Sequence, residues 1–162
     1  MRLCFVPTES GDFEALLALR IEAMRRASLE CLGRFDAQRA RERYLANFEP
    51  ACTQHIEAEQ PWGHDRLQFF AVKAVDGLLL LDQLYLRPGA HGLGVGAAVL
   101  AHVFERADAQ RLELRVGALR GNDANGFYQR HGLVLVDETA LDNYYRRVPR
   151  NRPSAPPSPP AA

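Results

Sequence analysis

The fold of this chain is decided by residues 84–97, which read LYLRPGAHGLGVGA. Alternating apolar residues predict a strand, which leads into a loop with three closely spaced glycines and then into an apolar helix pattern. Such glycines let backbone N–H groups converge without interference from a Cβ, and a helix N-terminus adds partial positive charge. The loop is expected to bind an anion such as a pyrophosphate, although the same glycines would also permit tight strand-to-helix packing.

The flanking sequence predicts helices and strands in mixed order. Asp12 is expected to cap the first helix, and Leu45 to lie on the buried stripe of the second. Hydrophobic periodicity and turn residues predict strands at Leu3–Val6, Thr53–Ala58, Leu67–Val75, Leu78–Arg87, 112–116, Leu133–Val136 and Asn143–Val148, and helices at 12–33, 36–50, 95–107 and 122–132. This order is typical of an α/β (α+β) domain with helices packed on a sheet.

Length and composition indicate one folded domain and a short tail. The chain has 162 residues, a size that suits one domain, and 47% of them are hydrophobic, which excludes wholesale disorder. The domain is expected over residues 1–148. Residues 149–162 are rich in proline among Ser and Ala with no apolar anchor, which predicts a disordered, extended tail.

Charge, hydropathy and cysteine content indicate which classes of partner and which cellular compartment to expect. Lys plus Arg and Asp plus Glu are both 20, whereas nucleic-acid binding favours a basic excess, so no nucleic-acid partner is expected. No run of about 20 apolar residues exists to span a membrane, and Met1–Pro7 is too short for a signal peptide. Three scattered cysteines predict no disulfide framework. We expect a cytoplasmic protein that acts on a small molecule or peptide.

A second segment, residues 122–133, reads NDANGFYQRHGL and follows the loop by one strand. With this pair of motifs the chain resembles the GNAT superfamily of N-acetyltransferases. The first motif of that family is a strand, a Pro and then Gln/Arg-x-x-Gly-x-Gly/Ala, which opens a helix. The second motif is an Asn, an Ala and an aromatic–Tyr pair, followed by a Gly–aromatic pair. The resemblance runs from Leu3 to Val148. His91 replaces the family's Gln or Arg and Leu133 replaces its Phe, and neither change removes the backbone anion site.

The resemblance implies a fold, a reaction and a set of donor-binding residues. The fold would be a GNAT-like central mixed, mostly antiparallel sheet flanked by four helices. The reaction would be direct transfer of an acetyl group from acetyl-CoA, as co-substrate, to the amine of an unidentified acceptor. The residues that would bind acetyl-CoA, through backbone groups in the strand, are Leu84, Tyr85, Leu86, His91, Gly92, Leu93, Gly94, Val95, Gly96, Ala97, Asn122 and Tyr128.

Two side chains are candidates for the proton transfers. The resemblance makes Tyr128 the acid that protonates the departing sulfur; alternatively, Tyr128 is a half-buried aromatic whose hydroxyl bonds to the backbone. Asp82 matches an acidic position in some family members and would act as the base, sharing a face with Leu84 and Leu86. Alternatively, Asp82 is an ordinary strand residue and water carries the proton.

Other interpretations stay open. Gly92–Ala97 also fit a dinucleotide-binding loop, but five residues separate them from the strand, and only one strand–helix–strand unit follows. The chain could also be a catalytically silent acyl-CoA-binding module or a non-enzymatic interaction protein, and a homodimer is not excluded.

The remaining candidates concern the acceptor and a metal. By the resemblance, acceptor selectivity would sit around Arg20, Ser28, Arg34 and Asp36, which could equally form a solvated face. Trp62 would line that pocket or anchor a turn. Cys52, His55 and His64 match no metal-site spacing, so no metal is expected.

Overall fold

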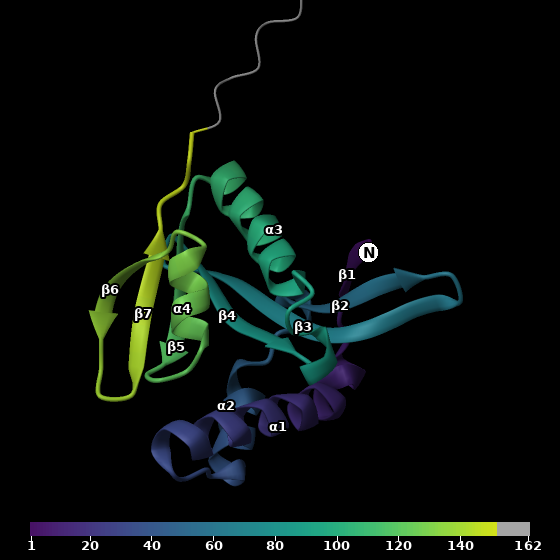
Figure 1. Ribbon diagram of the computed structural model, residues 1–162, viewed down its shortest axis with the longest axis horizontal. Helices are drawn as coiled ribbons and strands as arrows, with labels where there is room; N and C mark the ends of the chain where they lie inside the picture. Colours follow the sequence, from purple (N-terminus) through teal and green to yellow (C-terminus); the bar gives the residue numbers. More distant parts are fainter. Residues whose placement is uncertain (152–162) are drawn as a thin grey trace, which may run out of the picture.

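The computed structural model describes residues 1–151 of the chain (Figure 1). Its strands are β1 (Leu3–Pro7), β2 (Thr53–Gln60), β3 (Gly63–Val75), β4 (Leu78–Leu86), β5 (Glu113–Leu119), β6 (Val134–Glu138) and β7 (Asp142–Arg147). Its α-helices are α1 (Phe13–Leu32), α2 (Ala37–Asn47), α3 (Val95–Gln110) and α4 (Ala124–Arg130). Residues 148–151 have no regular structure, and the rest of the predicted tail lies outside the described residues.

The seven strands form one sheet in the order β1-β2-β3-β4-β5-β7-β6. Neighbouring strands are antiparallel except β4 and β5, which run parallel and are joined by α3. A single parallel pair cannot make a doubly wound sheet, so the dinucleotide-binding alternative does not fit this topology. The predicted mixed, mostly antiparallel sheet with four α-helices is confirmed within residues 1–151.

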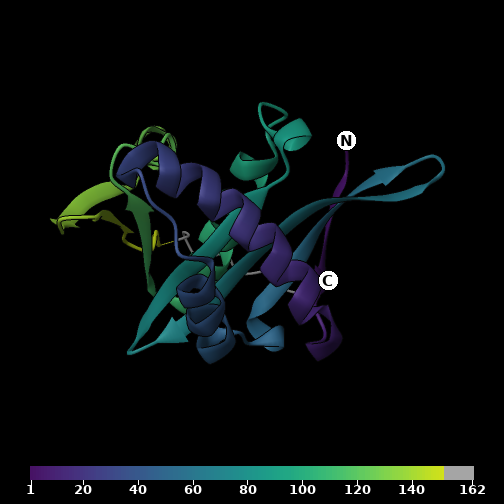
Figure 2. The ribbon, with the colours of Figure 1, turned by 90° about the horizontal axis from the view of Figure 1, so that it is seen from below.

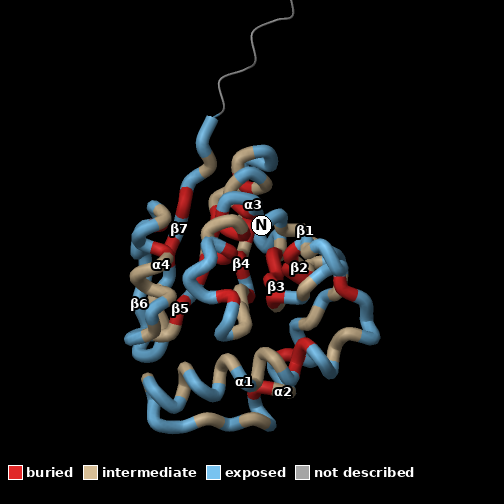
Figure 3. The backbone as a smooth tube through the Cα atoms, turned by 45° about the vertical axis from the view of Figure 1, so that its right-hand side comes forward, coloured by how far each residue is buried: buried red, intermediate tan, exposed pale blue. Residues whose placement is uncertain are grey.

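Helices cover both faces of the sheet. Buried α3 residues such as Val99 and Val103 pack with the central strands and Tyr128 of α4 into the main core. On the opposite face, Leu16 of α1 and Tyr44 of α2 enclose Phe69 of β3 in a second cluster. Figure 2 shows α1 running obliquely across that second face. In Figure 3 the buried stretches gather on the central strands, whereas β6 is exposed throughout.

The ends of the first two helices follow local chemistry, with two corrections. Gly33 ends α1 in the left-handed conformation, and the Asp36 side chain accepts from the Arg39 N–H to cap α2, so the end of the first helix and the start of the second lie where they were predicted. Asp12 makes no cap bond to α1, because its carboxylate accepts from the Glu9 N–H and from His55 Nε2 instead. Leu45 is 64% exposed, so its place on the buried stripe was wrong.

Within residues 1–151, no helix combines the length and apolar character needed to cross a membrane. The Pro61–Trp62 turn joins β2 to β3 in a long hairpin. Trp62 is 83% exposed in that turn, so its indole neither anchors the turn nor lines a pocket.

Candidate active site

An opening in the sheet lies between β4 and β5. The two strands pair only over Leu78–Leu81 and Glu113–Val116, yet β4 continues to Leu86 and β5 to Leu119. Beyond these paired residues, the edges of β4 and β5 that face each other therefore have no hydrogen-bonded neighbour. Such an edge offers backbone N–H and C=O groups to a ligand.

A β-bulge at Asp82 marks the point where pairing stops. On β3, Ala71 is opposite Gln83 and Val72 is opposite Leu81, so Asp82 is the extra residue on β4. A bulge bends its strand and increases its twist, and bulges are frequent beside active sites. The bend explains why β4 leaves β5 at this position.

The bulge also changes which way the side chains point. The main core contains Leu79 and Leu81 from before the bulge and Leu84 from after it. Odd-numbered residues thus give way to an even-numbered one, because one inserted residue reverses which side chains point to each face. Tyr85 packs into the second cluster, under α1 and α2. The exposed Asp82 carboxylate accepts from Gln83 Nε2 at 3.3 Å.

The prediction that Asp82 shares the face of Leu84 and Leu86 was therefore wrong. Asp82 lies on the face that α1 and α2 cover, next to the opening. Nothing in the sequence pattern distinguishes a regular strand from one with a single inserted residue, so hydrophobic alternation could not reveal this placement.

The unpaired edge of β4 carries the amides of Leu84 and Leu86. The Arg87 N–H donates to Leu67 O on β3 at 3.1 Å, and the backbone groups of an extended strand alternate in direction. Those of Leu84 and Leu86 therefore face the opening. His91 Nε2 lies 3.0 Å from Leu86 O, so one of these carbonyls is already hydrogen-bonded to the imidazole.

The glycine loop fits an anionic group at the start of α3. Gly92 and Gly94 have φ of 75° and 76°, the left-handed region that favours glycine, and a Cβ at either would meet no atom within 4 Å. Ala98 N donates to Gly94 O, so the N–H groups of Val95–Ala97 precede the first intrahelical bond. Leu93 and His91 are exposed beside them. These N–H groups and the open space suit a diphosphate.

Gly96 has a different role from the two loop glycines. A Cβ at this buried position would lie 3.0 Å from Cζ of Phe127, which packs from α4. Gly96 therefore lets α3 and α4 approach closely. Its role is thus in packing, which was the alternative to anion binding for these glycines. The closely spaced glycines thus divide into two that shape the loop and one that joins the helices.

Replacing Gly96 by Val should lower the free energy of unfolding by about 1–3 kcal/mol, because Phe127 must move away from the added methyl groups. Urea unfolding measures the effect. Ala101→Val is the control, since Ala101 is exposed on the same helix. If both variants lose the same stability, β-branching in the helix explains the loss and the close approach does not.

Tyr128 belongs to α4, and its side chain lies in the main core. It is 6% exposed and packs against Phe127 and Tyr145 at ring-centroid distances of 5.5 and 6.0 Å. Burial raises the pKa of Tyr128, and the nearby Tyr85 raises it further, so the phenol stays protonated at neutral pH. Among residues 1–151, no hydrogen bond joins its hydroxyl to the backbone, so the structure gives no support to the backbone-bonded alternative.

Asn125 fixes the start of α4 relative to the opening. Its Nδ2 donates to Leu119 O and Asn122 O at 2.8 Å each, and its Oδ1 accepts from Asn143 Nδ2 and the Tyr145 hydroxyl. Sequence reasoning placed Asn125 in the motif but assigned it no role. Asn122, which was predicted to bind the donor, accepts from the N–H of Ala124, the first residue of α4.

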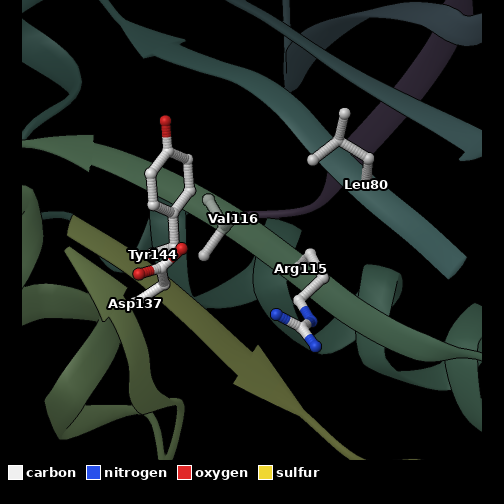
Figure 4. Close-up of a pocket in the computed structure, with 5 residues that line it drawn as sticks. All are labelled: Leu80, Arg115, Val116, Asp137 and Tyr144. Carbon is white, nitrogen blue, oxygen red and sulfur yellow. The ribbon is translucent and has the colours of Figure 1, made fainter. Parts of the chain in front are cut away.

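Other clusters contain none of the residues of the predicted site. Cys52, His55 and His64 each contact a different carboxylate, and residues 1–151 contain no group of three His, Cys, Asp or Glu side chains placed to hold a metal. A shallow depression on the β5–β7 side of the sheet is lined by side chains from four strands (Figure 4). They are Leu80, Arg115, Val116, Asp137 and Tyr144, and none belongs to the predicted site.

Comparison with known proteins gives the family. Residues 22–133, more than half of the chain, match the acetyltransferase (GNAT) family. The chain belongs to the acetyltransferase (GNAT) family. GNAT proteins are in general acyl-CoA-dependent acyltransferases, and the matched region contains the glycine loop, the β4–β5 opening and Tyr128.

Solved structures share the GNAT fold at low sequence identity. The PaiA N-acetyltransferase of Thermoplasma acidophilum, solved in complex with coenzyme A, has a TM-score of 0.66 and 16% identity, covering 91% of this chain and 99% of that one. A GNAT acetyltransferase of Staphylococcus aureus has a TM-score of 0.66 and 15% identity, covering 92% and 100%. An acetyltransferase of Thermus thermophilus has 0.66 and 16%, covering 91% and 97%. A search of curated proteins found no match.

Proposed function

We propose that this GNAT protein transfers an acetyl group from acetyl-CoA to the amine of an acceptor molecule. The main support for this proposal is the β4–β5 opening, which has a glycine loop at one end, Tyr128 on one face of the sheet and Asp82 on the other. A similar fold was solved with coenzyme A, which supports this choice of donor. Acetyl-CoA would supply an acyl group activated as a thioester.

Backbone groups would hold the donor. The N–H groups of Val95–Ala97 would bind the pyrophosphate, aided by the partial positive charge of the α3 N-terminus. The amides of Leu84 and Leu86 face the opening and would bind the pantetheine arm. The same edge would place an N–H near the acyl oxygen, where it stabilises developing negative charge.

The two proton transfers would occur on opposite faces of the sheet. Asp82 is exposed on the α1–α2 face and would accept the proton of the amine, directly or through water. Tyr128 belongs to the α4 face and would donate the proton of its hydroxyl to the departing sulfur. With acid and base on separate sides, the acceptor amine would approach from the α1–α2 face.

An amine screen tests this proposal. Acetyl-CoA is incubated with the protein and with amino acids, polyamines, aminoglycosides, peptides or lysine-bearing proteins, and released thiol is read. We expect at least one amine to raise thiol release well above the blank without amine. Calorimetric binding of acetyl-CoA with no amine-dependent release would instead identify a catalytically silent acyl-CoA-binding module.

Replacing Tyr128 by Phe should lower kcat by about 10- to 10²-fold, because it removes the hydroxyl and keeps the ring. The effect is modest because a thiol with a pKa of about 8.5 is already a tolerable leaving group. Burial raises the pKa of Tyr128 above its ordinary value of 10, so the kcat ratio of wild type to variant should stay constant from pH 6 to pH 9.

Three measurements distinguish an acid from a structural aromatic at Tyr128. Acetyl-CoA affinity should stay within a few-fold of wild type, and Tm should change little. An unchanged kcat, or a fall in Tm alone, would make Tyr128 a packing residue.

A further inference from the structure

A cluster of polar side chains lies beside the opening, on the face that α1 and α2 cover. Arg20 comes from α1, Tyr44 from α2, and Asp82, Gln83 and Tyr85 from β4. The proposed chemistry uses Asp82 but gives no role to the side chains of Arg20, Tyr44 or Gln83. We call these five residues the Arg20 cluster.

Three buried polar atoms of the Arg20 cluster have no hydrogen-bond partner within residues 1–151. They are Arg20 Nε, the Tyr44 hydroxyl and Gln83 Oε1. Tyr44 is 1% exposed and Gln83 6% exposed, so both side chains are almost fully enclosed. Buried polar groups are nearly always paired, and leaving them unpaired is costly. Arg20 Nε and the Tyr44 hydroxyl can donate, whereas Gln83 Oε1 can only accept, so the three atoms together indicate a site that a ligand with both an acceptor and a donor completes.

The charge of Arg20 indicates the chemistry of that ligand. Arg20 Nη1 makes a long hydrogen bond to Ala40 O at 3.5 Å, and the guanidinium lies over the Tyr44 ring at 5.1 Å. By contrast, Arg41 on α2 binds both oxygens of Glu14 at 3.0 and 2.6 Å. Within residues 1–151, Glu14 pairs with Arg41, whereas no carboxylate lies within ion-pair distance of Arg20.

Two tyrosine hydroxyls add hydrogen-bond donors to the cluster. Burial raises the pKa of Tyr44 to about 12. Burial also raises the pKa of Tyr85, while its hydrogen bond with Arg20 opposes that shift. Both hydroxyls are thus protonated at neutral pH. A guanidinium fork flanked by phenol donors matches a planar carboxylate better than it matches a cation or an apolar group.

We propose that the Arg20 cluster is the acceptor site and that Arg20 binds a carboxylate of the acceptor, which is an amine that also carries a carboxylate group. This inference rests on the proposed acetyl transfer and names its substrate class. Asp82 is the exposed member of the cluster and lies at the bulge where the opening begins. A carboxylate anchored on Arg20 would orient the rest of the acceptor toward Asp82.

Matched acceptor pairs test the inference. The probes are L-amino acids and Gly-Xaa dipeptides, each with a free C-terminal carboxylate and as the carboxamide, which separates a free amino acid from a peptide end. Wild type, Arg20→Met, Arg20→Lys and Arg43→Met are compared by calorimetry and by kcat/KM. Arg43→Met is the control, because Arg43 is exposed on α2 and its replacement removes the same charge.

We expect wild type to prefer the carboxylate member of a pair. Arg20→Met should lower kcat/KM for that member by about 10- to 10²-fold and for the carboxamide by no more than a few-fold. Arg20→Lys should restore part of the loss, and Arg43→Met should behave as wild type. Comparing the loss across each pair cancels the difference in amine basicity between carboxylate and carboxamide.

Each other outcome is decisive. Acetyl transfer without carboxylate preference, or an equal loss for both members, overturns the inference and leaves the proposed function intact. Carboxylate-selective, Arg20-dependent binding without any transfer supports the site and overturns the proposed function. If no carboxylate-bearing amine binds or reacts, the inference fails.

Replacing Tyr44 by Phe gives an independent readout. The variant removes a buried hydroxyl without a partner, so Tm should rise or stay unchanged. The KM for a carboxylate-bearing acceptor should nevertheless increase, because one donor to the carboxylate is lost. A lower Tm with an unchanged KM would assign Tyr44 to packing alone and would remove it from the site.

Discussion

Replacing Gly94 by Asp is expected to lower acetyl-CoA affinity by about 10²-fold or more while the protein stays folded. Gly94 is the N-cap residue of α3, and a Cβ there would enter open space next to the N–H groups of Val95–Ala97. The carboxylate would occupy the place proposed for the pyrophosphate. Two like charges about 4 Å apart near a protein surface repel by about 4 kcal/mol, which exceeds a hundredfold change in affinity.

Gly94→Asn is the matched control, because Asn has the size of Asp without the charge. Asn also tolerates the left-handed φ of 76° that Gly94 adopts. Both residues are good helix N-caps, and a negative charge at a helix N-terminus is stabilising, so Gly94→Asp should be at least as stable as Gly94→Asn. Calorimetry and thermal unfolding read the two effects. Equal acetyl-CoA affinities of the two variants would remove the pyrophosphate from this loop.

Replacing Asp82 by Asn is expected to lower kcat by about 10²-fold or more at neutral pH, because the amide cannot accept the proton of the amine. The amide oxygen can still accept from Gln83 Nε2, so the bulge should persist and Tm should change little. The loss should shrink as pH rises, since more of the amine is then already deprotonated. Steady-state kinetics from pH 6 to pH 10 measures both features.

Asp76→Asn is the matched control for this prediction. Asp76 is an exposed carboxylate in the turn between β3 and β4, at the end of β4 away from the opening, and its replacement removes the same charge. It should leave kcat within about twofold, as most surface substitutions away from a site change little. If Asp82→Asn also keeps a near-normal rate at pH 7, water carries the proton and Asp82 has no catalytic role.

The sequence predicted the fold because its signals are local and agree with one another. Hydrophobic periodicity, the turn residues and the paired motifs all indicated the observed order of elements. The failures were also local. Asp12 was predicted to cap a helix, but its carboxylate binds the distant His55 and the preceding turn. Competition of that kind appears only when the chain is folded.

The candidate site was predictable in position but not in arrangement. The resemblance predicted Asp82, the glycine loop and Tyr128 as site residues, whereas the bulge that turns Asp82 toward α1 and α2 leaves no mark on the sequence pattern. Glycine spacing could not show that Gly94 adopts a left-handed conformation while Gly96 accommodates Phe127. Likewise, Tyr44 is an aromatic residue within a predicted helix, and only packing reveals that its hydroxyl is buried without a partner.

The most direct test of the central claim follows the acetyl group itself. The protein is given acetyl-CoA with an isotopically labelled acetyl group and an amine identified in the screen, and mass spectrometry follows the label. We predict that the label appears on the amine in the same amount as free thiol is released, with none on the protein. Label found only in acetate or on the protein, with the amine unmodified, would contradict direct transfer to an amine in the β4–β5 opening.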